Sequence, residues 1–361
     1  MNDKLSRRRF LHVAGGSALG AVAASCTQYT GSQDGGAELP LYVDDDVGRG
    51  WPVLRGPYLQ RNAQIAAFLL PADPGQLQQM CDRYLNTPTG GRLNYAPLMP
   101  YVAMLVADMK VSSLDERDRE LGWMRETELG FWIPTVARAQ AGGLYIPDRT
   151  GWFLPYLYVN NPSAIATGRE VYGFPKMLAR FDKPLDVQNP EFAVDVWGFA
   201  QSGSEVEGTM QRLAELRRRD ESRAASAAVT WGSWDAARAE ITRLLAESDS
   251  SVDEAALQQL VPSDRMEILT VFLKQFRDVT DTRRACYQAI IEATIRLQHF
   301  HSGELLDSTY DLTFHTLQNH PLVQTLGLNA DESGTVQPLV GLRIHVDFTL
   351  EHGVEIWRAG I

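Results

Sequence analysis

The sequence predicts an α+β fold that is predominantly antiparallel β, arranged as a barrel or as packed sheets with a helical insertion. Apolar residues alternate strictly at Leu342, Ile344, Val346, Phe348 and Leu350, which indicates a long strand with one buried face. Strands and helices do not alternate regularly along the chain, which disfavours a parallel sheet. The 361 residues, 44% of them hydrophobic, suffice for one large globular domain or two small ones.

The N-terminus has the pattern of a twin-arginine export signal. Residues 6–11, Ser-Arg-Arg-Arg-Phe-Leu, precede a weakly apolar run. Residues 1–25 are therefore expected to direct export, either to the periplasm or to the outer side of the cytoplasmic membrane. Small residues precede Cys26, and two outcomes stay open there: attachment of a lipid anchor and ordinary signal cleavage. Residues 26–50 are rich in Gly, Ser and Asp and are expected to form a flexible tether.

Residues 51–361 are expected to form the folded domain, which begins with a strand at Ile65–Leu70. A helix follows, with Asp73 as its capping residue and Pro74 in its first turn. Cys81 lies on the apolar face of this helix and is expected to be a buried, inert thiol. Further strands are expected where apolar residues gather or alternate, at residues 101–109, 192–196, 291–300, 310–314 and 342–350.

Residues 203–270 differ from the rest in being rich in Ala, Arg, Glu and Asp. Met210, Leu213 and Leu216 follow a helical spacing, and a second such set begins at Trp234. These patterns predict a helical insertion of two or three helices. Two roles stay open for it: capping the pocket of one subunit and packing between subunits.

Charge and motifs exclude several classes of function. The formal net charge of −11 argues against nucleic acid or an anionic membrane surface as a partner. The sequence has no zinc-binding HExxH motif, no nucleophile elbow, no phosphate-binding loop and no dinucleotide fingerprint. We therefore expect neither a metal nor a bound cofactor.

Lys176 is the candidate nucleophile. In a strand, Phe174 and Leu178 would face the same way as Lys176, because strand side chains alternate with period two. An amine between two apolar side chains is poorly solvated, which disfavours the charged ammonium and favours the nucleophilic neutral amine.

The stretch around Lys176 resembles the signature of the acetoacetate decarboxylase family. The family carries an Ala-Ile-Ala-x-Gly-Arg-Glu run and then Pro-Lys, which this chain matches at residues 164–170 and 175–176. The likeness covers about residues 53–200 and 270–358. It implies the acetoacetate decarboxylase-like fold, a homo-oligomer, and a carboxy-lyase without cofactor. Lys176 would form a Schiff base with acetoacetate or a related β-keto acid, and carbon dioxide would leave from the iminium.

The resemblance also implies partners for Lys176. Residues 126–134 resemble a family segment that places Glu128 on the active-site glutamate, with Glu126 as the register alternative. Arg61 follows an Arg-Gly-Pro-Tyr segment and is the candidate to hold the substrate carboxylate through its paired donors. Arg169 and Glu170 match the signature, and we expect them to form a structural ion pair or a pocket wall.

The chain departs from the family at Met177, where the best-known members have a second lysine. Burial is therefore expected to activate Lys176, with Phe174 and Met177 bordering the substrate. The departure keeps a second function open, aldol addition or dehydration on a keto acid such as pyruvate through the same lysine. A third is a non-catalytic exported protein that binds a ligand.

Overall fold

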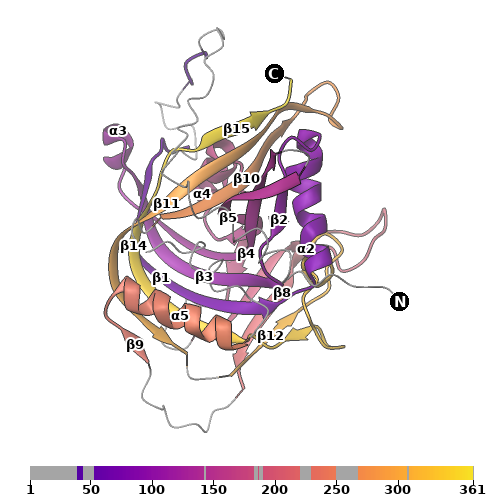
Figure 1. Ribbon diagram of the computed structural model, residues 1–361. Helices are drawn as coiled ribbons and strands as arrows, with labels where there is room; N and C mark the ends of the chain where they lie inside the picture. Colours follow the sequence, from indigo (N-terminus) through magenta and orange to yellow (C-terminus); the bar gives the residue numbers. More distant parts are fainter. Residues whose placement is uncertain are drawn as a thin grey trace. The chain divides into compact units, whose positions relative to one another are not determined.

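The structure is a computed structural model that describes residues 39–43, 53–141, 144–182, 186, 190–219, 229–248, 267–306 and 309–360. The chain divides into two units, Met1–Val43 and Asp44–Ile361. In the first unit, the described residues form neither helix nor strand. The predicted signal at residues 1–25, Cys26 and most of the predicted tether lie outside the described residues. All the described helices and strands belong to the second unit (Figure 1).

Seven strands of the second unit close into a barrel. Their order around the barrel is β1 (Tyr58–Pro71), β3 (Tyr101–Ser113), β4 (Met124–Ala141), β5 (Leu144–Val159), β10 (Glu267–Arg277), β11 (Ala285–Leu305) and β14 (Val340–Leu350). The ring closes because β14 pairs with β1. Every pairing in the ring is antiparallel except the one between β5 and β10. The predicted fold class, predominantly antiparallel β, is confirmed.

A second sheet leaves the barrel wall at β5. Strand β6 (Lys176–Phe181) pairs in parallel with β5 and antiparallel with β7 (Phe192–Gly198). The sheet continues through β8 (Thr209–Arg218), β12 (Tyr310–Phe314) and β13 (Thr335–Val336). Three short strands add to the barrel: β2 (Tyr95–Pro97) on β4, and β9 (Thr230–Trp231) and β15 (Val354–Arg358) on β11. Strand β6 thus connects the barrel with the second sheet.

Five helices are present among the described residues of the second unit, and most of them are short. They are α2 (Pro74–Cys81), α3 (Glu116–Arg119), α4 (Pro162–Val171), α5 (Trp234–Ser248) and α7 (Leu322–Leu326), with a π-helical turn at Asp82–Asn86 and a 3-10 turn at Thr87–Thr89. Helix α2 begins as predicted, because the Asp73 side chain accepts a hydrogen bond of 2.8 Å from the backbone N–H of Gln76. Cys81 is buried and free, and burial raises the pKa of its thiol to about 12. Among the described residues, no helix has the length and apolar character needed to cross a membrane.

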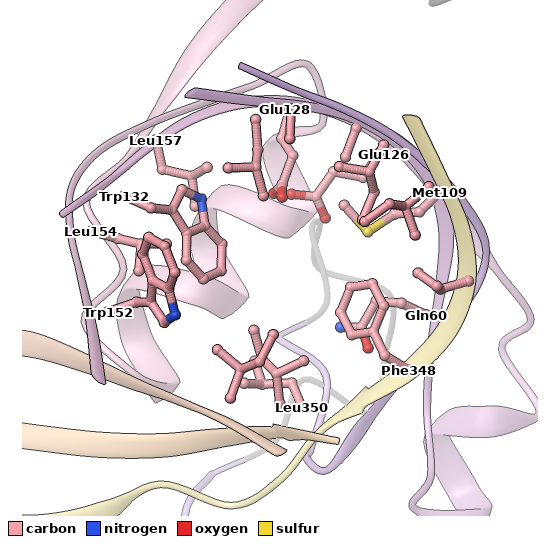
Figure 2. Close-up of a pocket in the computed structure, with 18 of the residues that line it drawn as sticks. Gln60, Met109, Glu126, Glu128, Trp132, Trp152, Leu154, Leu157, Phe348 and Leu350 are labelled. Carbon is pink, nitrogen blue, oxygen red and sulfur yellow. The ribbon is translucent and has the colours of Figure 1, made fainter. Parts of the chain in front are cut away.

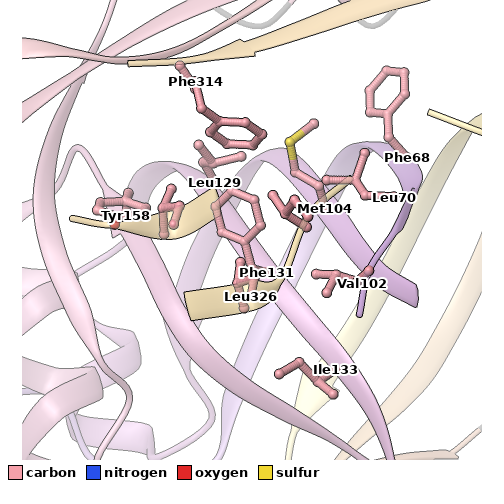
Figure 3. Packing of buried hydrophobic residues seen from close by; sticks show 14 of the residues in the cluster. Phe68, Leu70, Val102, Met104, Leu129, Phe131, Ile133, Tyr158, Phe314 and Leu326 are labelled. Carbon is pink, nitrogen blue, oxygen red and sulfur yellow. The ribbon is translucent and has the colours of Figure 1, made fainter. Parts of the chain in front are cut away.

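The main core lies between the outer face of the barrel and the second sheet (Figure 3). Val102 and Met104 of β3 and Phe131 of β4 point into it, and Phe314 of β12 approaches Phe131 with 5.9 Å between ring centroids. The alternate residues of β3 and β4 therefore point into the barrel. Because many of these are apolar too, residues 101–109 form a nearly continuous apolar run.

The predicted insertion is only partly helical. Helix α5 is present, but Met210, Leu213 and Leu216 belong to strand β8, which pairs with β7 and β12. A register shift in the β7–β8 ladder falls beside Leu213, so one extra residue interrupts the alternation. The resulting spacing of three residues resembles that of a helix, which explains the wrong prediction. Residues 220–228 and 249–266 of the predicted insertion lie outside the described part of the chain.

Candidate active site

The barrel encloses a cavity of about 230 Å³. All seven barrel strands contribute side chains, and Trp234 of α5, Phe174 from the loop before β6 and Lys176 of β6 complete the lining. Four of the 24 lining residues are polar: Gln60, Glu126, Glu128 and Lys176. Figure 2 shows Glu126 and Glu128 pointing into the cavity, with Trp132 and Trp152 along its wall. A cavity with few, converging polar groups in an apolar wall is typical of a small-molecule site.

Lys176 is the first residue of β6 and enters the cavity where β6 meets β5. Its side chain is 11% exposed, and Nζ lies 2.5 Å from Oε1 of Glu126. The ring of Phe174 lies 5.6 Å from Nζ, in agreement with the predicted shared face. Leu178 does not take part, because it is 47% exposed. After Leu178 the strand leaves β5 and pairs with β7 of the second sheet, so the apolar surroundings of the lysine come from Phe174 and the barrel wall.

Gly168 of helix α4 explains how the signature supports Lys176. A Cβ atom at Gly168 would lie 2.8 Å from Cδ and 3.1 Å from Cε of Lys176, so the lysine chain packs directly against the helix backbone. Helix α4 is fixed at its start by Asn161, whose side chain accepts hydrogen bonds from the backbone N–H groups of Ser163 and Ala164. Gly168 therefore makes room for the lysine on the way to Glu126.

Arg169 and Glu170 were expected to pair with each other or to form a wall. Within the described structure no ion pair joins them, and Arg169 instead donates a hydrogen bond of 3.3 Å to the backbone carbonyl of Lys176. Both are neighbours on α4 and neither lines the cavity. Arg169 thus holds the main chain of the lysine and does not reach the substrate.

Replacement of Gly168 with alanine is expected to slow imine formation at Lys176 by about tenfold to a hundredfold. The added methyl group pushes the lysine away from Glu126, and small displacements of reacting groups are costly. Helix α4 itself is not weakened, since alanine favours a helix over glycine. Trapping with borohydride measures the rate. Gly232→Ala, where the new Cβ meets nothing within 4 Å, is the control; equal rates in both variants would refute this role.

Glu126 and Glu128 lie two residues apart on β4, on the face that points into the barrel. The sequence placed Glu128 on the active-site glutamate and kept Glu126 as the register alternative; in the structure Glu126 contacts Lys176 and is 3% exposed. Glu128 lies beside it and lines the same cavity. Burial, followed by the charge of Glu126, raises the pKa of Glu128 from 4.5 to about 8, and the nearby Lys176 only partly offsets this. At neutral pH Glu128 is therefore mostly a neutral acid.

Two residues expected at the substrate lie elsewhere. Arg61 does not line the cavity; it is exposed, with its guanidinium 5.2 Å from the ring of Trp123. Met177 packs against the main core, because it follows Lys176 directly and faces the opposite side of the strand. Gln60, which sequence reasoning missed, lines the cavity in place of Arg61.

A β-bulge explains why Gln60, and not Arg61, lines the cavity. The register of β1 shifts between Gln60 and Gln64, and Asn62 has a positive φ of 51°. The bulge reverses the alternation, so Gln60 points inward on one side of it and Ile65 on the other. Apolar periodicity detects only the longer, regular part of β1.

Metal ligands do not gather at this site or elsewhere in the described chain. Within the part that the structure describes, His, Cys, Asp and Glu side chains form no group of three or more suited to a metal ion. The chemistry available at the cavity is that of an amine, two carboxyl groups and an amide.

Comparison with known proteins finds a family and similar solved structures. The family model of acetoacetate decarboxylase matches residues 51–355. The chain is similar in structure to acetoacetate decarboxylase from Legionella pneumophila, with 16% identity, a TM-score of 0.52, and coverage of 90% of this chain and 93% of that one. A further acetoacetate decarboxylase structure gives 18% identity, a TM-score of 0.52, and coverage of 86% and 93%.

A third similar structure is the enduracididine biosynthesis enzyme MppR, complexed with the condensation product of pyruvate and imidazole 4-carboxaldehyde. It has 13% identity, a TM-score of 0.50, and coverage of 89% of this chain and 98% of that one. At these identities the structural likeness shows the fold alone. No curated protein sequence matches the chain.

Proposed function

Because the chain belongs to the acetoacetate decarboxylase family, we propose that it is a lyase that decarboxylates a β-keto acid through a Schiff base on Lys176. The observation that supports this most is the contact of 2.5 Å between Nζ of Lys176 and Glu126 inside an apolar cavity. The lysine is held on the substrate side of the barrel wall, with a proton acceptor already in contact and a neutral acid, Glu128, beside it.

The two glutamates divide the proton transfers. Glu126 takes the proton of the Lys176 ammonium, and the neutral amine attacks the ketone. Protonated Glu128 donates to the carbinolamine oxygen, which leaves as water and yields the iminium. Carbon dioxide leaves as the bonding electrons move into the iminium. Protonation of the enamine carbon and hydrolysis then free the ketone and the lysine. The reaction needs no further cofactor.

The charges at the cavity favour decarboxylation over the aldol alternative. Among the described lining residues, Lys176 is the single cation. A carboxylate that stays on the substrate, as in pyruvate, has no separate cation to hold it there. The carboxylate of a β-keto acid is lost as neutral carbon dioxide, which removes a charge from an apolar site. Aldol addition stays the second candidate because MppR is complexed with a pyruvate condensation product.

Borohydride reduction in the presence of acetoacetate tests the Schiff base. Mass added at Lys176 together with release of carbon dioxide is the expected result. An adduct without carbon dioxide would transfer support to the aldol alternative. No adduct with any keto acid would leave only the non-catalytic binding protein.

Replacement of Glu128 with glutamine is expected to remove a pH dependence of both activity and stability. In the parent, activity should fall as the pH rises through about 8, because Glu128 loses the proton it donates. The variant should lack this limb: it should be slower by about a hundredfold below pH 7, and the difference should shrink as the pH rises above 8. Glu120→Gln, at an exposed position, is the control.

The raised pKa of Glu128 also makes the stability of the fold depend on pH. Its pKa is about 8 when folded and 4.5 as the ordinary value, so between these pH values the folded state binds the extra proton. The free energy of unfolding should therefore fall from pH 4.5 to pH 8, by an amount on the order of a few kcal/mol. Urea unfolding at pH 5 and pH 9 measures it. A parent and a Glu128→Gln variant with identical pH dependence would contradict the assignment.

We also propose that the protein is exported by the twin-arginine route and forms a homo-oligomer. Residues 6–11 support export by the twin-arginine route, and Cys26 is the proposed site of a lipid anchor, with ordinary signal cleavage as its alternative. Family membership supports a homo-oligomer. Cell fractionation of the parent and of an Arg7→Lys, Arg8→Lys variant tests export: retention of the variant in the cytoplasm is expected, and equal export would exclude the route.

A further inference from the structure

The cavity extends well beyond the reacting groups. On β3, Met109 pairs with Glu126, and Ala103 pairs with Trp132. These positions are six residues apart, which corresponds to about 20 Å along a strand. The part of the cavity away from Glu126 is lined only by apolar side chains, and we call it the apolar channel: Ala67, Ala103, Leu105, Trp132, Trp152 and Ile344.

Small side chains make the room in this channel. Ala67 and Ala103 face inward from neighbouring strands at positions where larger residues would fill the barrel. The cavity of about 230 Å³ is about half as large again as the engineered apolar cavity of about 150 Å³ that holds benzene. Acetoacetate has about as many non-hydrogen atoms as benzene, so it would leave much of this space unfilled.

The channel offers no compensation for a charge. The one cation in the described lining, Lys176, is already paired with Glu126. The indole N–H groups of Trp132 and Trp152 are buried without a partner among the described residues; they can donate a hydrogen bond but carry no charge. A carboxylate there would lose its hydration without gaining a cation.

From this lining we infer that the substrate carries a large uncharged apolar group, either an alkyl chain of about five or more carbons or an aromatic ring. The group lies in the apolar channel while the carbonyl reacts with Lys176. The inference rests on the proposed function, because the carbonyl is placed by imine formation. It distinguishes the substrate from acetoacetate by size and from keto dicarboxylates by charge.

Three ketones test the inference through borohydride trapping at Lys176: acetone, 2-heptanone and 4-oxopentanoate. Each buried methylene is worth about a fourfold gain in affinity. The concentration for half-maximal trapping should therefore fall at least about tenfold from acetone to 2-heptanone, and 4-oxopentanoate should gain nothing over acetone. Equal values for acetone and 2-heptanone, or a preference for 4-oxopentanoate, would overturn the inference and leave the Schiff base intact. No adduct with any of the three would overturn both.

A variant that fills the apolar channel shows whether the alkyl group of the ketone binds there. In Ala103→Leu the advantage of 2-heptanone over acetone should fall by at least about fivefold. Ala236→Leu, at an exposed position of α5, adds the same atoms outside the cavity and should keep the advantage. If Ala103→Leu does not fold, Ala67→Val on the neighbouring strand repeats the test. If a folded variant with a filled channel keeps the whole advantage of 2-heptanone over acetone, the apolar channel is excluded as the binding site of the alkyl group.

Discussion

Replacement of Lys176 with alanine is expected to abolish imine formation and to lower turnover by at least about four orders of magnitude. The lysine supplies the electrons of the new carbon–nitrogen bond, and the iminium is the electron sink for the leaving carbon dioxide. No other described residue of the cavity lining carries an amine. Reduction with borohydride in the presence of a ketone, followed by peptide mapping, measures the first effect, and release of carbon dioxide measures the second.

A second variant separates chemistry from folding. Lys176→Ala leaves the buried carboxylate of Glu126 without its partner, which costs stability. Lys176→Arg keeps a cation against Glu126 but has no nucleophilic amine, so it should fold and still fail to trap a ketone. Activity in Lys176→Arg would exclude the lysine as nucleophile.

Lys274 is the matched control among the five lysines of the chain. It is half-buried, burial lowers its pKa, and its Nζ donates to the backbone carbonyl of Val171. Of the described lysines outside the cavity it is therefore the one most prone to react. Lys274→Met should keep both trapping and turnover. Loss of the adduct in Lys274→Met alone would move the Schiff base to that residue.

The sequence was sufficient for the parts of the site that depend on local pattern. The signature identified Lys176, and apolar runs or alternation predicted four barrel strands, β1, β3, β11 and β14, while no such pattern predicted β4 and β5. The role of Gly168 was not visible, because the contact of its helix with the lysine chain depends on how α4 packs on β6. The pairing of Lys176 with Glu126 depends likewise on β4 and β6 meeting in space. A match to a short segment left the choice between Glu126 and Glu128 open.

Irregular backbone accounts for the errors. Because of the bulge near Asn62, Gln60 and not Arg61 faces the cavity. Because of the register shift beside Leu213, the apolar residues of strand β8 have a spacing that resembles that of a helix. Alternation has a further limit, seen at Ile344 and Val346. Their pattern predicts one apolar face of a strand, yet that face borders a cavity and not the packed core. Periodicity reports which side is apolar and says nothing of how completely the opposite wall fills the space.

Replacement of Glu126 with glutamine is expected to slow trapping at Lys176 by about a hundredfold to ten-thousandfold. Glu126 is 3% exposed and lies 2.5 Å from Nζ of Lys176, so its loss removes the nearest acceptor for the ammonium proton. An amide of the same shape keeps the packing but accepts no proton. Stopped-flow or quenched trapping with 2-heptanone measures the rate, and Glu116→Gln, at an exposed position, is the control.

The same variant should change Glu128 in a defined direction. After burial itself, the charge of Glu126 and the hydrogen bond that neutral Glu128 donates to it both raise the pKa of Glu128. Without that charge, and with the ammonium of Lys176 still present, the pKa of Glu128 should fall below about 8. The pH range in which stability declines should then end at a lower pH, since the range closes at the folded pKa. An unchanged range in Glu126→Gln would show that the two carboxyl groups act independently, and the division of proton transfers between them would have to be abandoned.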